Sequence, residues 1–518
     1  MHKSSNLIIG HQRTLQFCWL ENTEEGPSLP LFFHSSVCVC SLMTRKRKVE
    51  KKILHINTEY SNSSYHTNHL FVIMSELVNY IHEFGTALKE ENPSDFIKCI
   101  TISPTITIAN TRKEFPEPND VDLFHIPEKF RPVLKCHIQL MKAVYNEKSL
   151  DKAFDVLNQL ILNLIMASDF LTNWINCPLI KSLSELVAIY KTKESRNPED
   201  LDSFIEDDAD AFGGTTQSQK SCLESLVITF RKACQLSLGD KNLDSELTKR
   251  NDVYYFLANF VKYCFKLGKL DLAKSVIKAV KNISNRLPAL DSTVKTKKYG
   301  VIYLYYQALM ALDDGDYIES EENLEYAMKL MDDYQDLKSN QLGQILLVLI
   351  PLKLHNHGQF PLKKIWLKYP VLRSLYRDNF LKAILEGNIA RFNQSSEKFQ
   401  IILLKKHLYV LIEMLRPLVH LQLIKKTYRL IMELNSDSKS KHLVPISAFQ
   451  LALEYSTFNK DYECDFNFAG DHLYAISKSE TECILGYLIS KGRIRAYLST
   501  LKEGYVVFAK TDTFPKPQ

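Results

Sequence analysis

Most of the chain repeats one pattern, in which apolar residues at helical spacing alternate with short polar turns. In four places the turn is followed by an apolar anchor and, three positions later, by a small or apolar residue. These turns lie at residues 146–150, 266–270, 314–317 and 386–389, and the later residues are Ala153, Ala273, Ser320 and Phe392. Apolar stripes on both sides of a turn predict two antiparallel helices.

The turn at residues 314–317 shows the pattern most clearly. Tyr303 and Met310 belong to one apolar stripe before Gly315, while Leu324 and Met331 belong to another after it. Two such helices cannot bury their apolar faces alone, so neighbouring pairs must cover each other. The unequal spacing of the turns indicates a degenerate array, and we predict a mainly α protein built as a TPR-like helical-repeat solenoid.

The pattern changes near the C-terminus. Residues 445–453 and 481–491 predict two short helices, and Gly492 suits the left-handed cap that ends the second one. Alternation with period two then replaces the helical period over residues 494–498, and residues 505–508 are β-branched or aromatic after a turn at 502–504. Helix, helix and hairpin in this order predict a C-terminal winged helix.

Two segments lack sustained apolar periodicity. Residues 1–73 are predicted to be a poorly ordered basic extension, in which residues 45–52 are either a nuclear-import signal or a solvated charge run, and Met74 is a plausible alternative start. Residues 191–219 contain an acidic stretch and two glycines, which predicts an exposed loop. We therefore expect an N-terminal helical region at 74–243, a repeat region at 244–442 that includes the helical part of the last domain, and a winged helix with its tail at 443–518.

Composition supports a helical protein and excludes several classes. Sixteen glycines and eighteen prolines in 518 residues are few for an all-β fold, and the net charge of +5 is small for this length. The eleven cysteines include no CxxC pair, so neither a zinc ribbon nor a disulfide framework is expected. No apolar stretch approaches the roughly 18 residues of a membrane helix, so no membrane association is predicted.

Catalytic motifs are not found either. The chain has no phosphate-binding GxxxxGK[ST] loop and no GxGxxG turn. His355 and His357 have the spacing of two zinc ligands, but no Ser and Asp follow at the required positions. We expect no metal, no cofactor and no enzymatic activity.

One region is strongly basic. Residues 352–430 contain fifteen Lys or Arg and four Asp or Glu, an excess of eleven positive charges. Such a surface would attract phosphates or an acidic partner, although a solvated helical face is the alternative. The candidate binding residues, with those of the predicted wing, are Lys405, Lys406, Lys425, Lys426, Arg429, Arg493, Arg495 and Lys502. Trp366, Tyr369 and Tyr376 lie among these charges, where they either stack on bases or belong to the core.

The second helix of the predicted winged helix is not basic. It has Glu480 and Glu482 near Lys478 and Lys491. Winged helices read bases with a basic helix in the major groove, so contacts with proteins are the better expectation for this module.

The C-terminal part of the chain resembles a known family, the PCI-domain proteins of the branch that holds signalosome subunit-twelve-like proteins and Thp-type mRNA-export subunits. The resemblance rests on the order of several short segments. These are residues 346–353, 383–388, 425–430, 486–489, 492–497 and 506–510, followed by Phe514-Pro515. Together they cover about the last 200 residues.

The resemblance implies a helical arm fused to a winged helix and used as a binding platform. It also implies a small acidic partner of the Sem/Dss type, other PCI-domain subunits, and work in the nucleus and cytoplasm. The leading hypothesis is a non-catalytic scaffold subunit of a COP-nine signalosome-like complex, of the subunit-twelve type, with a link to transcription or splicing. The alternative is a TREX-two-like mRNA-export subunit that binds RNA or DNA through its basic surface.

Overall fold

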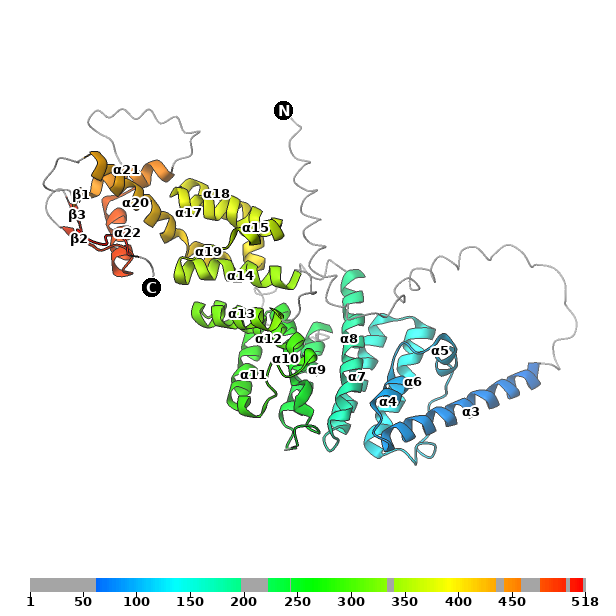
Figure 1. The fold of residues 1–518 in the computed structure, drawn as a ribbon. Coiled ribbons are helices and arrows are strands. Elements are labelled where there is room, and N and C mark those ends of the chain that lie inside the picture. The colour runs from blue at the N-terminus through cyan, green and yellow to red at the C-terminus, as the bar shows by residue number, and fades with distance from the viewer. Residues whose placement is uncertain are drawn as a thin grey trace, which may run out of the picture.

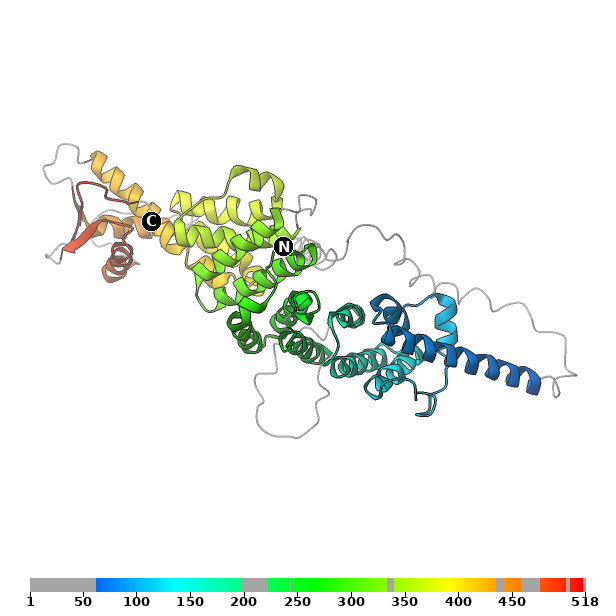
Figure 2. The same ribbon diagram turned by 60° about the horizontal axis from the view of Figure 1, so that its bottom comes forward.

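A row of helices forms an elongated arm that carries a small α/β unit at one end (Figure 1). The computed structural model describes residues 62–196, 222–242, 244–332, 340–434, 442–457, 476–499 and 504–515. The N-terminal helices and the α/β unit lie at opposite ends of the arm, and Figure 2 shows the same separation from another direction.

The first part of the arm packs around aromatic side chains. Its helices are α3 (Asn62–Lys89), α4 (Pro93–Ile100), α5 (Ile106–Arg112), α6 (Arg131–Lys142), α7 (Leu150–Ala167) and α8 (Asn176–Arg196). The Phe96 ring is buried within 6.2 Å of the Phe130 ring and 5.7 Å of the Trp174 ring, centre to centre. Since α3 begins at Asn62, helix already occupies the end of the segment that was expected to have little fixed structure.

The middle of the arm is a row of helices in which α10 and α13 each pack on several neighbours. It comprises α9 (Cys222–Leu238), α10 (Val253–Leu267), α11 (Leu270–Ile283), α12 (Val294–Asp313), α13 (Tyr317–Asp332) and α14 (Asn340–His357). Helix α10 contacts α9, α11 and α12, and α13 contacts α12 and α14. Each apolar face is covered by a neighbouring helix, as the solenoid prediction required.

Shorter helices follow and end in one long helix. They are α15 (Lys363–Lys368), α16 (Pro370–Leu372), a π-helical segment at Arg373–Leu381, α17 (Lys382–Glu386), α18 (Ile389–Lys405), α19 (Tyr409–Glu413) and α20 (Arg416–Leu434). Helix α20 packs on α17 and α18 of the arm and on α21 and α22 of the terminal unit. It therefore connects the two parts of the molecule.

The terminal unit is a winged helix, as predicted. It contains β1 (Leu443–Pro445), α21 (Ile446–Thr457), α22 (Lys478–Ser490), β2 (Ala496–Ser499) and β3 (Tyr505–Phe508). The three strands form an antiparallel sheet in the order β1-β3-β2. Its core combines aliphatic side chains with a group of aromatic rings, in which the Phe508 ring lies 4.5 Å from that of Tyr428 and 5.9 Å from that of Phe449. The sequence patterns did not reveal β1, which has three residues, nor that Leu421 and Ile424 of α20 join this core.

All four predicted turns separate two helices, and each contains a residue in the left-handed region. These residues are Lys148, Gly268, Gly315 and Gly387, with φ between 53° and 79°. The small or apolar residues that follow each turn, Ala153, Ala273, Ser320 and Phe392, are all buried. The local pattern therefore identified true helix reversals.

Several predicted features lie outside the described residues. They are the basic run at 45–52, most of the acidic loop at 191–219, and Lys502 in the predicted wing. Among the described helices, none is both long enough and apolar enough to cross a membrane.

Candidate functional site

The winged helix sits on the arm through the turn between α17 and α18. At Gly387 the turn approaches α20 so closely that a Cβ there would lie 2.8 Å from the backbone nitrogen of Leu423. From α21, the buried Ser456 hydroxyl donates to Gly387 O at 2.8 Å and accepts from Ile389 N at 2.9 Å. This turn, with α20 and Ser456, is called the joint below.

Two further contacts strengthen the joint. The Lys426 ammonium of α20 donates to Glu386 O at 2.8 Å, and Leu453 of α21 belongs to the hydrophobic core of the arm. The winged helix is therefore held by backbone and apolar contacts together, which fixes its position on the arm.

The structure brings three of the predicted basic residues together. Lys425 and Arg429 lie on α20, and Arg493 follows α22. Burial and the nearby Arg429 and Arg493 cations lower the pKa of Lys425. No ion pair with a carboxylate involves any of these three side chains in the described parts of the chain. A bound anion would relieve the repulsion among them. These three residues are called the basic triplet.

The remaining candidates do not join the triplet. Lys405 and Lys406 end α18, next to His407, whose ring lies 5.5 Å from Phe265 of α10. They therefore belong to the arm, and burial lowers the pKa of Lys406. Arg495 pairs with Asp512 at 2.9 Å. The basic region of the sequence is thus divided between two places.

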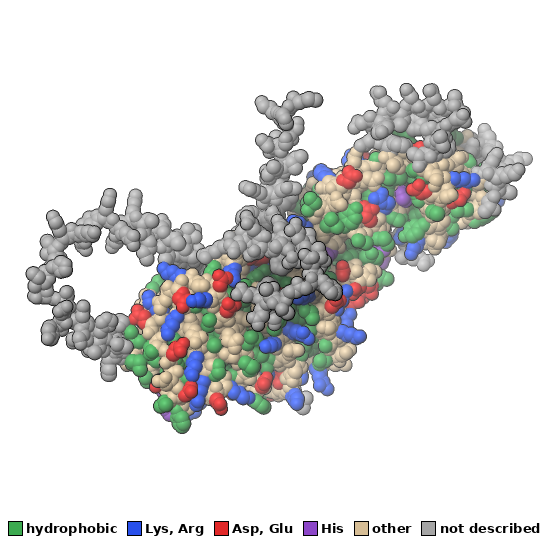
Figure 3. Space-filling view, turned by 180° about the vertical axis from the view of Figure 1, so that it is seen from behind, with side chains coloured by type: hydrophobic (Ala, Val, Ile, Leu, Met, Phe, Trp, Pro, Cys, Tyr) green, Lys and Arg blue, Asp and Glu red, His purple; other side chains and the backbone are tan. Residues whose placement is uncertain are grey.

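The aromatic residues among the basic charges are not placed for base stacking. Trp366 and Tyr376 are buried, and the Tyr376 hydroxyl donates to Leu347 O at 2.5 Å. The Tyr369 ring lies close to Gly343, where an added Cβ would be 3.4 Å from the ring. All three therefore contribute mainly to packing. On the face shown in Figure 3, Lys and Arg side chains are interspersed with Asp and Glu over the arm, so this face presents no extended basic surface.

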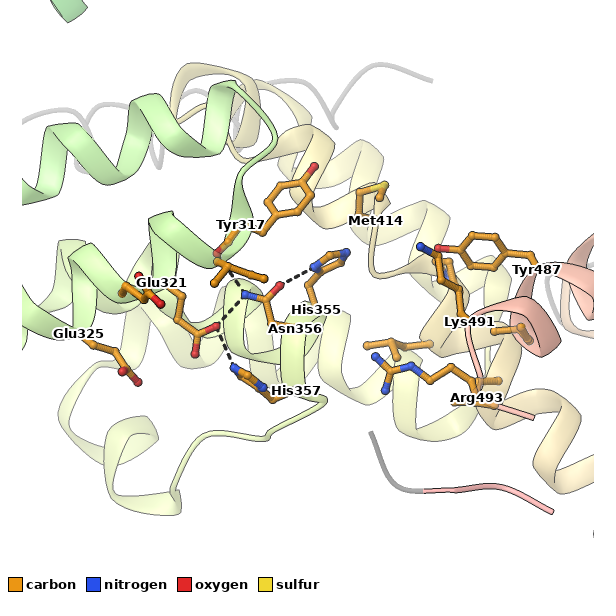
Figure 4. A pocket seen from close by; sticks show the side chains of 16 residues that line it. Tyr317, Glu321, Glu325, His355, Asn356, His357, Met414, Tyr487, Lys491 and Arg493 are labelled. Atoms are coloured by element: carbon orange, nitrogen blue, oxygen red, sulfur yellow. Dashed lines mark hydrogen bonds and ion pairs between the residues drawn. The ribbon is translucent and has the colours of Figure 1, made fainter. Parts of the chain in front are cut away.

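A cleft of about 760 Å³ separates the arm from the winged helix. One wall consists of α13 and the end of α14, and the opposite wall is the end of α22 with the residues after it (Figure 4). The floor is apolar, with Pro417, Leu418 and Leu421 of α20.

The His355-Asn356-His357 run lines this cleft with the hydrogen-bonding pattern of a structural site. The Asn356 amide donates to Glu321 Oε2 at 2.7 Å and to Tyr317 O at 3.1 Å, and His357 Nε2 lies 3.2 Å from Glu321 Oε2. The His355 ring packs against Tyr317 at 4.7 Å between centres. In the described part of the chain, no three His, Cys, Asp or Glu side chains are grouped so that they would hold a metal ion.

Comparison with known proteins identifies the family. No protein-family model matches the chain. The chain is 44% identical over 442 residues to the "Protein CSN12 homolog" of Debaryomyces hansenii, which covers 85% of this chain and 98% of that protein. This chain belongs to the CSN12-like PCI-domain proteins.

More distant relatives agree with this assignment. The CSN12-like chain is 29% identical over 294 residues to the "Protein CSN12 homolog" of Schizosaccharomyces pombe, covering 57% of this chain and 62% of that protein. It is 27% identical over 284 residues to the "PCI domain-containing protein 2 homolog" of Drosophila melanogaster, covering 55% and 62%. The family resemblance derived from the C-terminal segments is thus confirmed.

Sequence patterns missed the parts of this CSN12-like protein that depend on distant contacts. Gly387 was recognised as a turn residue, but nothing nearby in the sequence points to Leu423 or Ser456. The cleft was also missed, since its walls come from α13 and α22, which are far apart along the chain.

Proposed function

We propose that this chain is a non-catalytic scaffold subunit of a COP-nine signalosome-like complex, of the subunit-twelve type, with a link to transcription or splicing. The observation that carries the proposal is the 44% identity over nearly the whole length of a CSN12 homolog, together with an arm and a winged helix joined as one platform. Assembly with other PCI-domain subunits in the nucleus and cytoplasm, and binding of a small acidic Sem/Dss-type protein, are parts of this proposal.

The winged helix offers a surface for another subunit. Strand β2 lies at an edge of the sheet, because the order is β1-β3-β2. An edge strand has unpaired backbone groups that a further strand can bind. Tyr497 on β2 is 64% exposed, which leaves an aromatic side chain free to anchor a partner.

Affinity purification of the full-length chain from its native host, followed by quantitative mass spectrometry, tests this proposal. We expect PCI-domain proteins and a small acidic protein among the specific partners. Tyr497→Glu should reduce recovery of PCI-domain partners severalfold, whereas the matched change Tyr455→Glu, at an exposed residue of α21, should not. Recovery of the unmodified chain without any PCI-domain protein would overturn the scaffold proposal.

A second function, that of a TREX-two-like mRNA-export subunit, is favoured by the basic triplet. Its three cations have no carboxylate partner among the residues that the structure describes, and such a group at the base of the winged helix is suited to phosphate. In this alternative the triplet binds RNA or DNA without reading bases, because α22 has Glu480 in its first turn.

Titration of a single-stranded RNA at two salt concentrations separates the two functions. The double variant Arg429→Glu/Arg493→Glu should bind the RNA more weakly. The number of counterions released on binding, measured from the salt dependence of the affinity, should fall by about two. The double variant Lys363→Glu/Lys364→Glu, at two exposed residues of α15, changes the net charge equally and should leave both the RNA affinity and its salt dependence unchanged. Equal losses in the two double variants would discard a specific role of the triplet, and absence of binding by the unmodified chain would discard this function altogether.

A further inference from the structure

The cleft between the arm and the winged helix has walls of opposite charge. Glu321, Glu322 and Glu325 of α13 lie on the arm side, and Lys491 and Arg493 lie on the winged-helix side. Figure 4 shows Glu321 and Glu325 at one end of the cleft and Lys491 with Arg493 at the other, with no interaction drawn across it.

On each wall, one exposed charged side chain has no ion-pair partner among the described residues. The Glu321 carboxylate accepts a hydrogen bond from Asn356 and lies next to His357, and Glu325 forms an ion pair with Lys353 at 2.5 Å. Within the described ranges, neither Glu322 nor Lys491 has an ion-pair partner, and the Lys491 ammonium lies 5.9 Å from the centre of the Tyr487 ring. Glu322 and Lys491 are both exposed.

Between the charged groups of the two walls, the cleft exposes apolar and aromatic side chains. Met414 is 39% exposed and Tyr487 is 41% exposed, and both line the cleft with Leu418. An occupant therefore meets carboxylates, then an apolar strip, then cations. Exposed apolar side chains in a concave site are typical of recognition of a linear segment.

We propose that this cleft binds a linear peptide segment of a partner protein, with basic residues at one end, apolar residues in the middle and acidic residues at the other end. The basic end lies against Glu322 and its neighbours, the apolar side chains cover Met414 and Leu418, and the acidic end pairs with Lys491. A nucleic acid does not fit this site, since its phosphates would meet three carboxylates along α13. The cleft is separate from the sheet edge, and its binding of a peptide does not depend on which complex recruits the chain.

Fluorescence anisotropy with three synthetic peptides tests the proposal on the full-length chain. The peptides share length and apolar centre, and differ only in having one basic and one acidic end, two basic ends or two acidic ends. The bipolar peptide should bind most tightly. Glu322→Lys and Lys491→Glu should each weaken it on the order of fivefold at low salt, the upper range for exposed ion pairs.

The double variant Glu322→Lys/Lys491→Glu decides between a specific cleft and general charge. It keeps the net charge of the chain but gives both walls charges of mixed sign, because Glu321, Glu325 and Arg493 remain, so the bipolar peptide should lose its advantage over the other two peptides. Met414→Ala should weaken all three peptides, because it removes part of the apolar floor. Equal affinities of the unmodified chain for the three peptides, an unchanged preference for the bipolar peptide in the double variant, or a single-stranded RNA that binds the cleft more tightly than the bipolar peptide would each overturn the proposal.

Discussion

The turns at Gly315 and Gly387 share a backbone conformation but differ in what surrounds them. Both glycines have positive φ, 79° and 64°, between two antiparallel helices. A Cβ at Gly315 would meet nothing within 4 Å, whereas one at Gly387 would lie 2.8 Å from the nitrogen and 3.0 Å from the Cα of Leu423. One turn only reverses the chain, and the other also seats the winged helix. The same local signal thus has two structural roles.

The largest effect should come from adding a methyl group at the joint. Gly387→Ala combines backbone strain of roughly 1–2 kcal/mol with overpacking of roughly 1–3 kcal/mol. We therefore expect the free energy of unfolding to fall by about 3 kcal/mol. Gly315→Ala should cost only about 1 kcal/mol, from the backbone strain alone.

Hydrogen–deuterium exchange compares the two glycine variants within one protein. In Gly387→Ala, protection should fall in α20 and α21 and remain normal in α12 and α13. If both variants lose protection to a similar extent and only at the turns, the close approach of Gly387 to Leu423 does not contribute to stability.

The second-largest loss of stability should come from removing the hydroxyl of Ser456, and Ser320, near the other turn, is the matched position. Ser456→Ala leaves the buried Ile389 N without its acceptor and should cost about 2 kcal/mol. Ser320→Ala, near Gly315, removes only a donor to Ala308 O and should cost about 1 kcal/mol or less. Urea unfolding, followed by hydrogen–deuterium exchange in α21 and α13, measures the two losses of stability. Equal losses in the two variants would contradict the role assigned to Ser456.

Acidification should weaken the joint before it weakens the turn at Gly315. Burial and the neighbouring Arg416 lower the pKa of His420, on α20, to about 4. The unfolded chain therefore binds a proton that the folded chain excludes, so the stability contributed by this site is complete above about pH 6.5 and falls as the pH drops toward 4.

Protection factors measured at pH 7 and pH 5 test the role of His420. Protection in α20 should fall more than in α12, and His420→Gln should remove that difference. Equal acid sensitivity of α20 in the His420→Gln variant would assign the effect to another group.

The smallest effect concerns the ammonium of Lys426. Lys426→Met keeps the aliphatic stem and removes an exposed hydrogen bond to Glu386 O, so we expect a cost of about 0.5 kcal/mol. Lys382→Met, on α17 and 3.9 Å from Glu386 in a loose ion pair, is the control and should be close to neutral. A cost at Lys426 near that of Ser456→Ala would mean that the joint depends on charge more than on the backbone contacts.

Features that depend on local order could be predicted from the sequence. The four helix reversals, the two helices of the winged helix and the hairpin after Gly492 follow from periodicity and turn chemistry over a few residues. Strand β1 could not be predicted because its three residues are identified as a strand only by pairing with β3. The patterns also set the start of the winged helix after α20, whereas Leu421 and Ile424 of that helix lie in its core.

The candidate site shows the same limit. A count of charges identified a basic region, but it could not separate Lys405 and Lys406, which lie near α10, from Lys425 and Arg429, which face Arg493. The sequence also offered no reason to place Glu322 opposite Lys491, because the two walls of the cleft, α13 and the end of α22, are brought together by packing between distant helices. Distant contacts decide which charges act together.

The central claim is that the joint at Gly387 holds the winged helix in the position from which the chain assembles with its partners. Quantitative mass spectrometry of complexes purified with unmodified, Gly315→Ala and Gly387→Ala chains, expressed at equal levels in the native host, tests it directly. The account predicts that PCI-domain partners are retained by Gly315→Ala and reduced at least severalfold by Gly387→Ala. Equal recovery of those partners by all three chains would contradict it.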